Sequence, residues 1–259
     1  MQRVFVVGCP RSGTTLVQAL LARHPAVLAL AGTGFFPHLY GDERQRWGDR
    51  DVRPPRRRLR VGLGFARRQA RMALQVMQGR LASDRELPAW PLRTTACVRC
   101  FIDLLDTRAG DDRRDAWVET TPCHLLYIPE IASAMPDARF VHVIRRGEDV
   151  LASIADANLR FDGNRAFGGG AVLWARRWNR ALQIHRQHAH EVRHHFVFLD
   201  DLLTDQAGEW RALCDFVGID AAATLDDTCG QTVADLLREP WKRGVVSGRP
   251  RAVTVKDER

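Results

Sequence analysis

Lysine is almost missing from this chain of 259 residues. Only Lys242 and Lys256 are lysines, whereas lysine and arginine together number 39 and the formal net charge is +8. Arginine therefore carries the positive charge, and its planar guanidinium matches the oxygens of phosphate and sulfate. The surplus predicts an anionic ligand, with nucleic acid as the competing partner.

Long hydrophobic runs are missing as well. No run reaches the length of a membrane span, and no charged start followed by an apolar stretch marks a secretory signal. Because 45% of the residues are hydrophobic, the chain can still bury a core. We expect a single cytoplasmic domain over residues 1–259, with no membrane partner and with an oligomeric state that the sequence leaves open.

Paired cysteines of the kind that bind zinc are also lacking. The chain has six cysteines but only one close pair, "CVRC" at 97–100, with no second pair to complete a site. In a cytoplasmic protein, reduced thiols are favoured over disulfides. The pair lies in the apolar helical stretch "ACVRCFIDLL", which favours packing in the core.

What the chain does contain is an alternation of strands and helices. Strand–turn–helix units are predicted at 4–23, at 138–157 and at 195–219. Such alternation is typical of an α/β fold, with a parallel sheet flanked by helices. Residues 41–95 interrupt it with "RPPRRRLR" and a basic helical stretch, so they are predicted to form a helical or irregular insert or cap over the core.

The first unit contains a glycine-rich turn, "GCPRSGTT" at 8–15. A strand, a tight turn and a helix point several backbone N–H groups at one place, and the helix dipole favours an anion there. Gly8 and Gly13 let the backbone fold closely around it. The residues predicted to bind the anion are Arg11, Ser12, Gly13, Thr14 and Thr15.

This turn lacks the lysine of a nucleotide triphosphatase. In the motif G-x-x-x-x-G-K-[ST], a lysine follows the second glycine and reaches the terminal phosphates. Here the spacing from Gly8 to Gly13 is kept, but Thr14 stands in the lysine's place. The pattern therefore favours an anion cradle without the machinery for a γ-phosphate. A P-loop kinase of a small metabolite is the first alternative.

Two segments together resemble a known family, the sulfotransferases that use 3′-phosphoadenosine 5′-phosphosulfate (PAPS). The stretch "GCPRSGTTLVQALLARHP" looks like their 5′-phosphosulfate loop, and "RFVHVIRRGEDVLASI" is similar to their second signature. The likeness is greatest to bacterial and tyrosylprotein sulfotransferases, and it extends to "WVETTPCHLLYIPEI" and "FLDDL". It implies a P-loop-containing three-layer fold, a PAPS donor and no metal. The implied reaction moves a sulfuryl group to a hydroxyl or amine of a small-molecule or peptide acceptor.

The resemblance also implies a second anion site. Arg145 and Ser153 match the residues that hold the donor's 3′-phosphate, and Arg145 follows a strand of a sheet whose ligands bind at the strand ends. An ATP enzyme has no use for a second phosphate site one nucleoside away. A surface ion pair of Arg145 with Glu148 or Asp149 is the alternative. The C-terminal segment "WKRGVVSGR" resembles a covering segment for the same phosphate, which would be bound by Lys242, Arg243 and Gly244.

The general base is where the chain departs from these relatives. The tyrosylprotein-type enzymes carry a glutamate shortly after "HP", where this chain has Ala31 and Gly32. Arg11 is predicted to stabilise charge on the departing oxygen, while Glu119 or His124 is predicted to take the acceptor's proton. His38 is a further candidate for the base. A core histidine is the alternative interpretation of His124.

Two further interpretations concern the remaining charge. A chain without these catalytic groups could be a binder without catalysis, either of a nucleotide or of nucleic acid. The arginine cluster at 53–60 has no interleaved aromatics and the chain has no recognition motif, so no nucleic-acid partner is predicted. The histidines between 185 and 195 are interpreted as a solvated helix face, and no metal site is predicted there.

Overall fold

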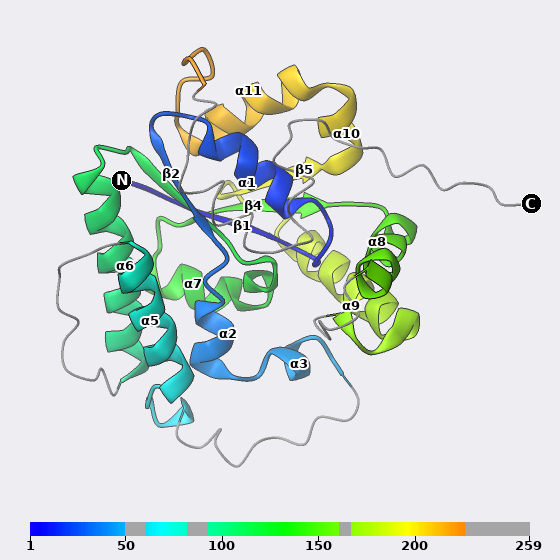
Figure 1. The fold of residues 1–259 in the computed structure, drawn as a ribbon, viewed down its shortest axis with the longest axis horizontal. Coiled ribbons are helices and arrows are strands. Elements are labelled where there is room, and N and C mark those ends of the chain that lie inside the picture. The colour runs from blue at the N-terminus through cyan, green and yellow to red at the C-terminus, as the bar shows by residue number, and fades with distance from the viewer. Residues whose placement is uncertain (50–60, 82–92, 161–166, 226–259) are drawn as a thin grey trace, which may run out of the picture.

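The computed structural model describes residues 1–49, 61–81, 93–160 and 167–225. Five strands in this part of the chain form one sheet in the order β2-β3-β1-β4-β5, and every neighbouring pair is parallel (Figure 1). They are β1 (Gln2–Gly8), β2 (Val27–Ala31), β3 (Ala116–Thr120), β4 (Arg139–Ile144) and β5 (His194–Phe198).

Helices cover both faces of the sheet. Along β1, Val4 and Val6 pack into one buried cluster while Phe5 and Val7 pack into another, as the alternation of a strand requires. On the first face lie α1 (Thr14–Ala22), α10 (Leu199–Thr204) and α11 (Gln206–Val217) (Figure 1). The other elements are α2 (Phe35–Tyr40), α3 (Glu43–Arg46), α5 (Arg68–Arg80), α6 (Thr94–Asp111), η1 (Pro122–Tyr127), α7 (Ile128–Ala134), α8 (Gly147–Arg160) and α9 (Gly170–Gln187). The predicted three-layer α/β fold is confirmed.

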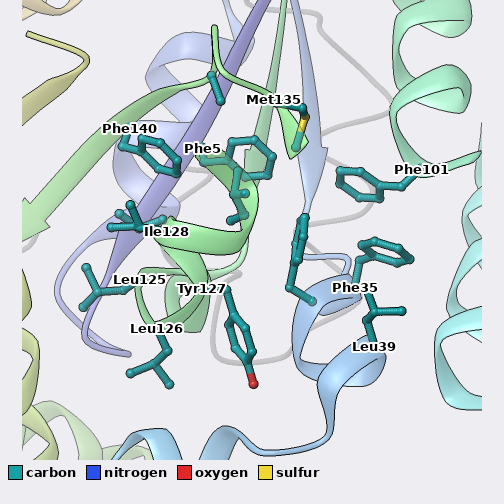
Figure 2. Close-up of a cluster of buried hydrophobic side chains, with 14 of the residues drawn as sticks. Phe5, Phe35, Leu39, Phe101, Leu125, Leu126, Tyr127, Ile128, Met135 and Phe140 are labelled. Atoms are coloured by element: carbon teal, nitrogen blue, oxygen red, sulfur yellow. The ribbon is translucent and has the colours of Figure 1, made fainter. Parts of the chain in front are cut away.

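The second face is closed by an aromatic core (Figure 2). Phe35 of α2 stacks on Phe101 of α6 with ring centroids 4.5 Å apart, and Phe5 stacks on Phe140 at 5.8 Å. All four rings are almost completely buried. Truncating such a side chain to alanine typically costs about 3–5 kcal/mol. This core therefore holds α2, and the loop before it, firmly against the sheet.

The predicted strand–turn–helix units are all present. They correspond to β1 with α1, β4 with α8, and β5 with α10 and α11. Two strands had no sequence prediction, β2 and β3. β2 is short but wholly apolar. β3 carries a glutamate although every residue in it is buried, so it does not read as an ordinary apolar strand.

Two further expectations concern the cysteine pair at 97–100 and the region 41–95. Cys97 and Cys100 are buried in α6, as the core interpretation of "CVRC" predicted. The arginine cluster at 53–60 lies outside the described residues, so the insert or cap at 41–95 and the single-domain boundary stay predictions. Within that region α5 packs against α2 and α6. No helix among the described residues is both long enough and apolar enough to span a membrane.

The strand order places a topological switch point beside the carboxyl end of β1. β1 lies in the centre, with β3 on one side and β4 on the other. The chain leaves β1 toward β2 and β3 and later crosses to β4, so the connections diverge at this point. In open parallel sheets, ligands bind at the carboxyl ends of the strands beside such a switch. The glycine-rich turn after β1 lies at this place.

Candidate functional site

The turn between β1 and α1 forms a backbone cradle. Arg11 has φ 73° and Gly13 has φ 99°, so two residues of the turn are left-handed. Left-handed residues in a turn direct successive N–H groups toward one concave surface that suits an anion. No side chain caps the start of α1, so in this described segment the dipole and the first N–H groups of the helix face the turn.

Two glycines are required by close packing of this turn. A Cβ on Gly8 would lie 2.6 Å from the carbonyl oxygen of Val143 in β4. A Cβ on Gly13 would lie 2.9 Å from Cδ1 of Leu199, and the positive φ at Gly13 disfavours other residues. The turn is therefore wedged between β4 and α10. Ser12 and Thr14 are buried in it, whereas Arg11 and Thr15 are partly exposed.

The second signature meets the turn in space. Gly8 pairs with Val143, so Arg145, two residues beyond Val143, emerges beside the turn. Nη1 of Arg145 donates a hydrogen bond to the carbonyl oxygen of Arg11 at 3.3 Å. Nε of Arg11 donates to Oγ of Ser153, on α8, at 3.0 Å. The structure thus brings together three predicted residues that are up to 142 positions apart.

The neighbouring arginine takes the ion pairs that were considered for Arg145. Nε of Arg146 contacts Asp149 at 2.9 Å and lies 3.8 Å from Glu148. Among the described residues no ion pair is recorded for Arg145. Its backbone is held instead by Trp178 of α9, whose Nε1 donates to the Arg145 carbonyl oxygen at 3.1 Å. The alternative of a surface ion pair is therefore wrong for Arg145.

Positive charge is concentrated at this edge of the sheet. Burial lowers the pKa of Arg11, and the nearby guanidinium of Arg145 lowers it further, while Asp156 opposes the shift. Two adjacent guanidinium groups destabilise each other unless an anion lies near both. The hydrogen-bond partner of the Arg11 side chain, Ser153, is neutral. This arrangement suits a ligand with more than one negative charge.

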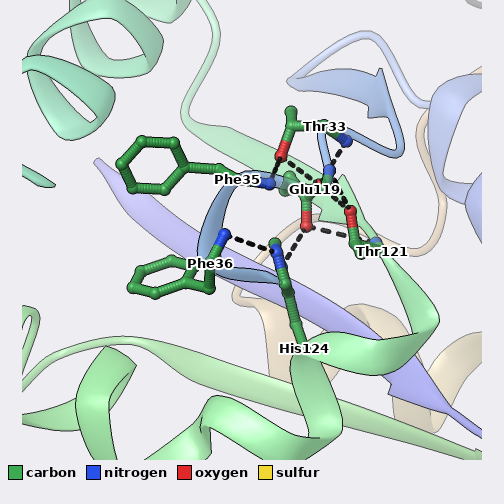
Figure 3. A network of polar contacts seen from close by, with 7 residues as sticks. Thr33, Phe35, Phe36, Glu119, Thr121 and His124 are labelled. Atoms are coloured by element: carbon green, nitrogen blue, oxygen red, sulfur yellow. Dashed lines mark hydrogen bonds and ion pairs between the residues drawn. The ribbon is translucent and has the colours of Figure 1, made fainter. Parts of the chain in front are cut away.

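Glu119 and His124, the two predicted bases, form a buried network instead (Figure 3). Oε1 of Glu119 accepts hydrogen bonds from the Thr33 amide, from Oγ1 of Thr33 (both 2.8 Å) and from Oγ1 of Thr121 at 2.5 Å. Nδ1 of His124 lies 2.8 Å from Oε2 of Glu119, although not in the direction of a hydrogen bond. The Phe36 amide donates to Nε2 of His124 at 3.4 Å. Neither side chain has any exposed surface.

The network keeps Glu119 charged. Burial alone would raise the pKa of Glu119, but His124, the Thr121 hydroxyl and the Thr33 amide together lower it below its ordinary value. Because Nε2 of His124 accepts a hydrogen bond from the Phe36 amide, a neutral imidazole must carry its own proton on Nδ1, on the side of the carboxylate. In this conformation neither side chain can contact an acceptor, so the role of base stays a prediction for both.

The chain matches a known protein family over most of its length. Residues 3–223 match the model of the sulfotransferase family. The chain belongs to that family. No curated protein matches the chain.

Two solved structures share the sulfotransferase fold. A sulfotransferase from Alicyclobacillus acidocaldarius has 15% sequence identity and a TM-score of 0.54, with 95% of this chain and 94% of that chain covered. The sulfotransferase domain of the Synechococcus olefin synthase has 18% identity and a TM-score of 0.52, with 85% and 74% covered. At these identities the likeness shows the fold alone. The family match shows a transferase, which was the predicted class of enzyme.

Of the two positions that match the glutamate of tyrosylprotein-type relatives, Gly32 is closed to a side chain. A Cβ on Gly32 would lie 2.8 Å from the Thr120 carbonyl oxygen, so a longer side chain has no room there. His38, on α2, is exposed. Its Nε2 would lie 3.4 Å from a Cβ on Gly34, so the imidazole sits beside the loop that Glu119 holds. Of the three predicted bases, His38 alone is open to solvent.

Some site residues have no sequence signal or lie outside the described part. Phe167 packs against Arg11, with the guanidinium carbon 5.8 Å from the ring centre, and Trp178 holds the Arg145 backbone. Neither residue belongs to a sequence motif. Their contacts form only when α9 and the residue Phe167 before it pack beside Arg11 and Arg145. Lys242, Arg243 and Gly244 lie outside the described residues, so their role stays a prediction.

The interpretation of the late histidines as a solvated face is wrong for two of them. His185 and His194 are almost completely buried. Both contact His142 of β4, a buried residue that the sequence did not single out. Burial, with neighbouring imidazoles, lowers the pKa of His142 well below its ordinary value and lowers that of His185 and of His194 to about 4. Packing against β4, which sequence spacing does not reveal, makes the difference.

Proposed function

We propose that this sulfotransferase moves a sulfuryl group from PAPS to a hydroxyl or amine of a small-molecule or peptide acceptor. One observation carries the proposal: Arg11, Arg145 and Ser153 meet at the carboxyl ends of β1 and β4. PAPS carries anionic groups on both sides of its nucleoside. The backbone cradle suits the 5′-phosphosulfate, and the second signature suits the 3′-phosphate.

Ser153 is suited to bind a phosphate. Its hydroxyl accepts a hydrogen bond from Arg11 and keeps its own proton to donate. A phosphate oxygen beside Ser153 and Arg145 would receive a hydroxyl donor and a charged donor together. It would also relieve the repulsion between the two guanidinium groups. Lys242, Arg243 and Gly244 are proposed to add donors from the C-terminal segment.

The cradle supports the transfer step through charge stabilisation. The bond between the sulfur and the bridging oxygen of the 5′-phosphate breaks, and the acceptor atom bonds to sulfur while it loses its proton. Arg11, Thr15 and the N–H groups at the start of α1 stabilise the charge left on the bridging oxygen. The phosphate product stays in the cradle that held the donor. In-line transfer further requires that the acceptor be held opposite the bridging oxygen.

The proton acceptor is proposed to be His38. It is exposed and belongs to the helix that follows β2 at the ligand-binding edge. Glu119 accepts a hydrogen bond from the Thr33 amide, and His124 accepts one from the Phe36 amide. This buried pair therefore holds the start of the same helix. Glu119 and His124 would act as bases only if the loop before α2 opened.

The donor site is tested by calorimetry with 3′-phosphoadenosine 5′-phosphate, without magnesium. Arg145→Ala is expected to weaken binding at least about tenfold, or ~1.4 kcal/mol, because a charged donor is lost. Arg146→Ala is the matched control: Arg146 is the next residue and is exposed, so its affinity change is expected to stay within about twofold. ATP should bind more weakly than the bisphosphate. Equal binding of the two nucleotides, or equal effects of the two variants, would contradict the proposal.

A further inference from the structure

A second cluster of polar side chains lies between α9 and β5, outside the proposed site. Here His188, Glu191 and His194 come within reach of one another. Nδ1 of His188 lies 2.9 Å from Oε1 of Glu191, and Nε2 of His194 lies 3.2 Å from Oε2 of the same carboxylate. One ligand atom from each residue lies within 4.8 Å of the other two.

The chemistry of this set suits a zinc-like ion. Two imidazole nitrogens and a carboxylate are a common set of protein ligands for a tetrahedral site that keeps one open position. With bonds of about 2.0–2.1 Å, neighbouring ligand atoms around such an ion lie about 3.3 Å apart. The observed separations, 2.9 Å from His188 to Oε1 and 3.2 Å from His194 to Oε2 of Glu191, are near that spacing. Because each nitrogen faces a different carboxylate oxygen, the carboxylate must turn before one oxygen and both nitrogens face the same ion.

Buried imidazoles support the cluster from behind. Nδ1 of His194 lies 2.7 Å from Nε2 of His142, and Nδ1 of His142 lies 2.8 Å from Nδ1 of His185. With Nε2 of His194 facing an ion, its Nδ1–H donates to His142, whose Nδ1–H in turn donates to His185. One consistent set of tautomers satisfies the whole chain. Metal-binding histidines usually donate their second N–H to such a partner, which fixes the ring.

The cluster is closed on one side and open on the other. The side chain of His194 is 3% exposed, that of His188 16% and that of Glu191 54%. An ion could therefore enter from solvent and keep a water as its fourth ligand. The rings of His188 and His194 are parallel, with centroids 4.5 Å apart. Binding requires the His188 ring to tilt so that both nitrogens point at the ion.

We propose that His188, Glu191 and His194 bind one divalent zinc-like ion with a structural role. The ligands lie at the end of α9 and at the start of β5, whereas Arg145 follows the far end of the adjacent strand β4. The ion therefore takes no part in sulfuryl transfer. It pins the end of α9 to the sheet through His194 and His142. The proposal is independent of the donor and the acceptor.

Calorimetric titration of the untagged, chelator-treated protein with zinc chloride tests the site. Wild type is expected to bind one ion per chain with micromolar or tighter affinity. Glu191→Ala and His188→Ala each remove a ligand, so each should weaken binding at least about tenfold. His190→Ala is the matched control, since His190 is exposed in the same turn; its affinity should match wild type. Magnesium chloride should not compete.

Two further measurements separate this site from binding elsewhere. Cobalt(II) should bind wild type without the absorption of a cobalt–thiolate bond, which excludes the cysteines. Zinc should raise the unfolding temperature of wild type and of His190→Ala but not that of Glu191→Ala. The reason is that the ion binds the folded state and not the unfolded state. Equal zinc affinity in wild type, Glu191→Ala and His188→Ala would overturn the proposal. So would the absence of micromolar binding to wild type.

Discussion

Two groups of charged residues lie near the carboxyl ends of the strands, and they are treated in opposite ways. Around Glu119, hydroxyl and amide donors and an imidazole surround one fully buried carboxylate. Around Arg11 and Arg145, two like charges lie close together, the Arg11 side chain donates a hydrogen bond to a neutral hydroxyl, and Asp156 offsets only part of the repulsion. A charge whose partners are all internal supports the fold. A charge that faces a like charge and donates to a neutral hydroxyl suits an anionic ligand, which is why we propose binding at the second group.

The largest expected effect on stability comes from removing Glu119 from its buried network. Glu119→Ala removes a buried carboxylate and leaves its donors and His124 without a partner. Losing one member of such a pair costs about 3–5 kcal/mol of unfolding free energy. Chemical denaturation of wild type and variant measures it.

Glu148→Ala provides the control for that loss. Its side chain is 73% exposed and lies 3.8 Å from Arg146, so a change within about 0.5 kcal/mol is expected. If Glu119→Ala were as stable as Glu148→Ala but inactive, Glu119 would be a catalytic group and the contrast between the two regions would fail.

A smaller effect on stability, but a large one on rate, is expected at His38. His38→Ala should lower kcat by about 10²-fold or more, because a general base is lost. Its unfolding free energy should stay within about 0.5 kcal/mol of wild type, since the side chain is exposed.

The loss of kcat in His38→Ala is the readout that identifies the base. Normal turnover by this variant would return the role of base to Glu119 or His124, after an opening of the loop that they hold.

The smallest expected effect is the pH dependence of the Glu119 contribution. Its pKa is lowered on folding from its ordinary value of 4.5. The stabilisation is therefore fully present above about pH 4.5 and is lost as the pH falls through the lower folded-state pKa. The difference in stability between wild type and Glu119→Gln should shrink over this acidic range. A difference that does not change from pH 6 to about pH 3 would mean that folding does not lower the pKa of this carboxylate.

Local patterns predicted the elements that surround the glycine-rich turn. The glycine spacing, the strand before it and the arginine after the second strand are properties of short segments, so the turn, α1, β4 and α8 followed from the sequence. The buried pair of Glu119 and His124 did not follow from local patterns. Glu119 looks like a surface residue or a catalytic acid until β2 and β3 pair, which places Thr33, 86 positions away, over its carboxylate.

The sequence by itself determined the α/β fold, the glycine-rich turn and the family, because each depends on spacings within single strand–turn–helix units. Only the tertiary structure decided which charges are satisfied. It buried Glu119 and His124, left His38 exposed and gathered His142, His185, His188 and His194 from two strands and a helix end. The physical reason is that the state of a charged side chain is set by the dielectric and by the partners around it. Segments far apart in the chain supply both.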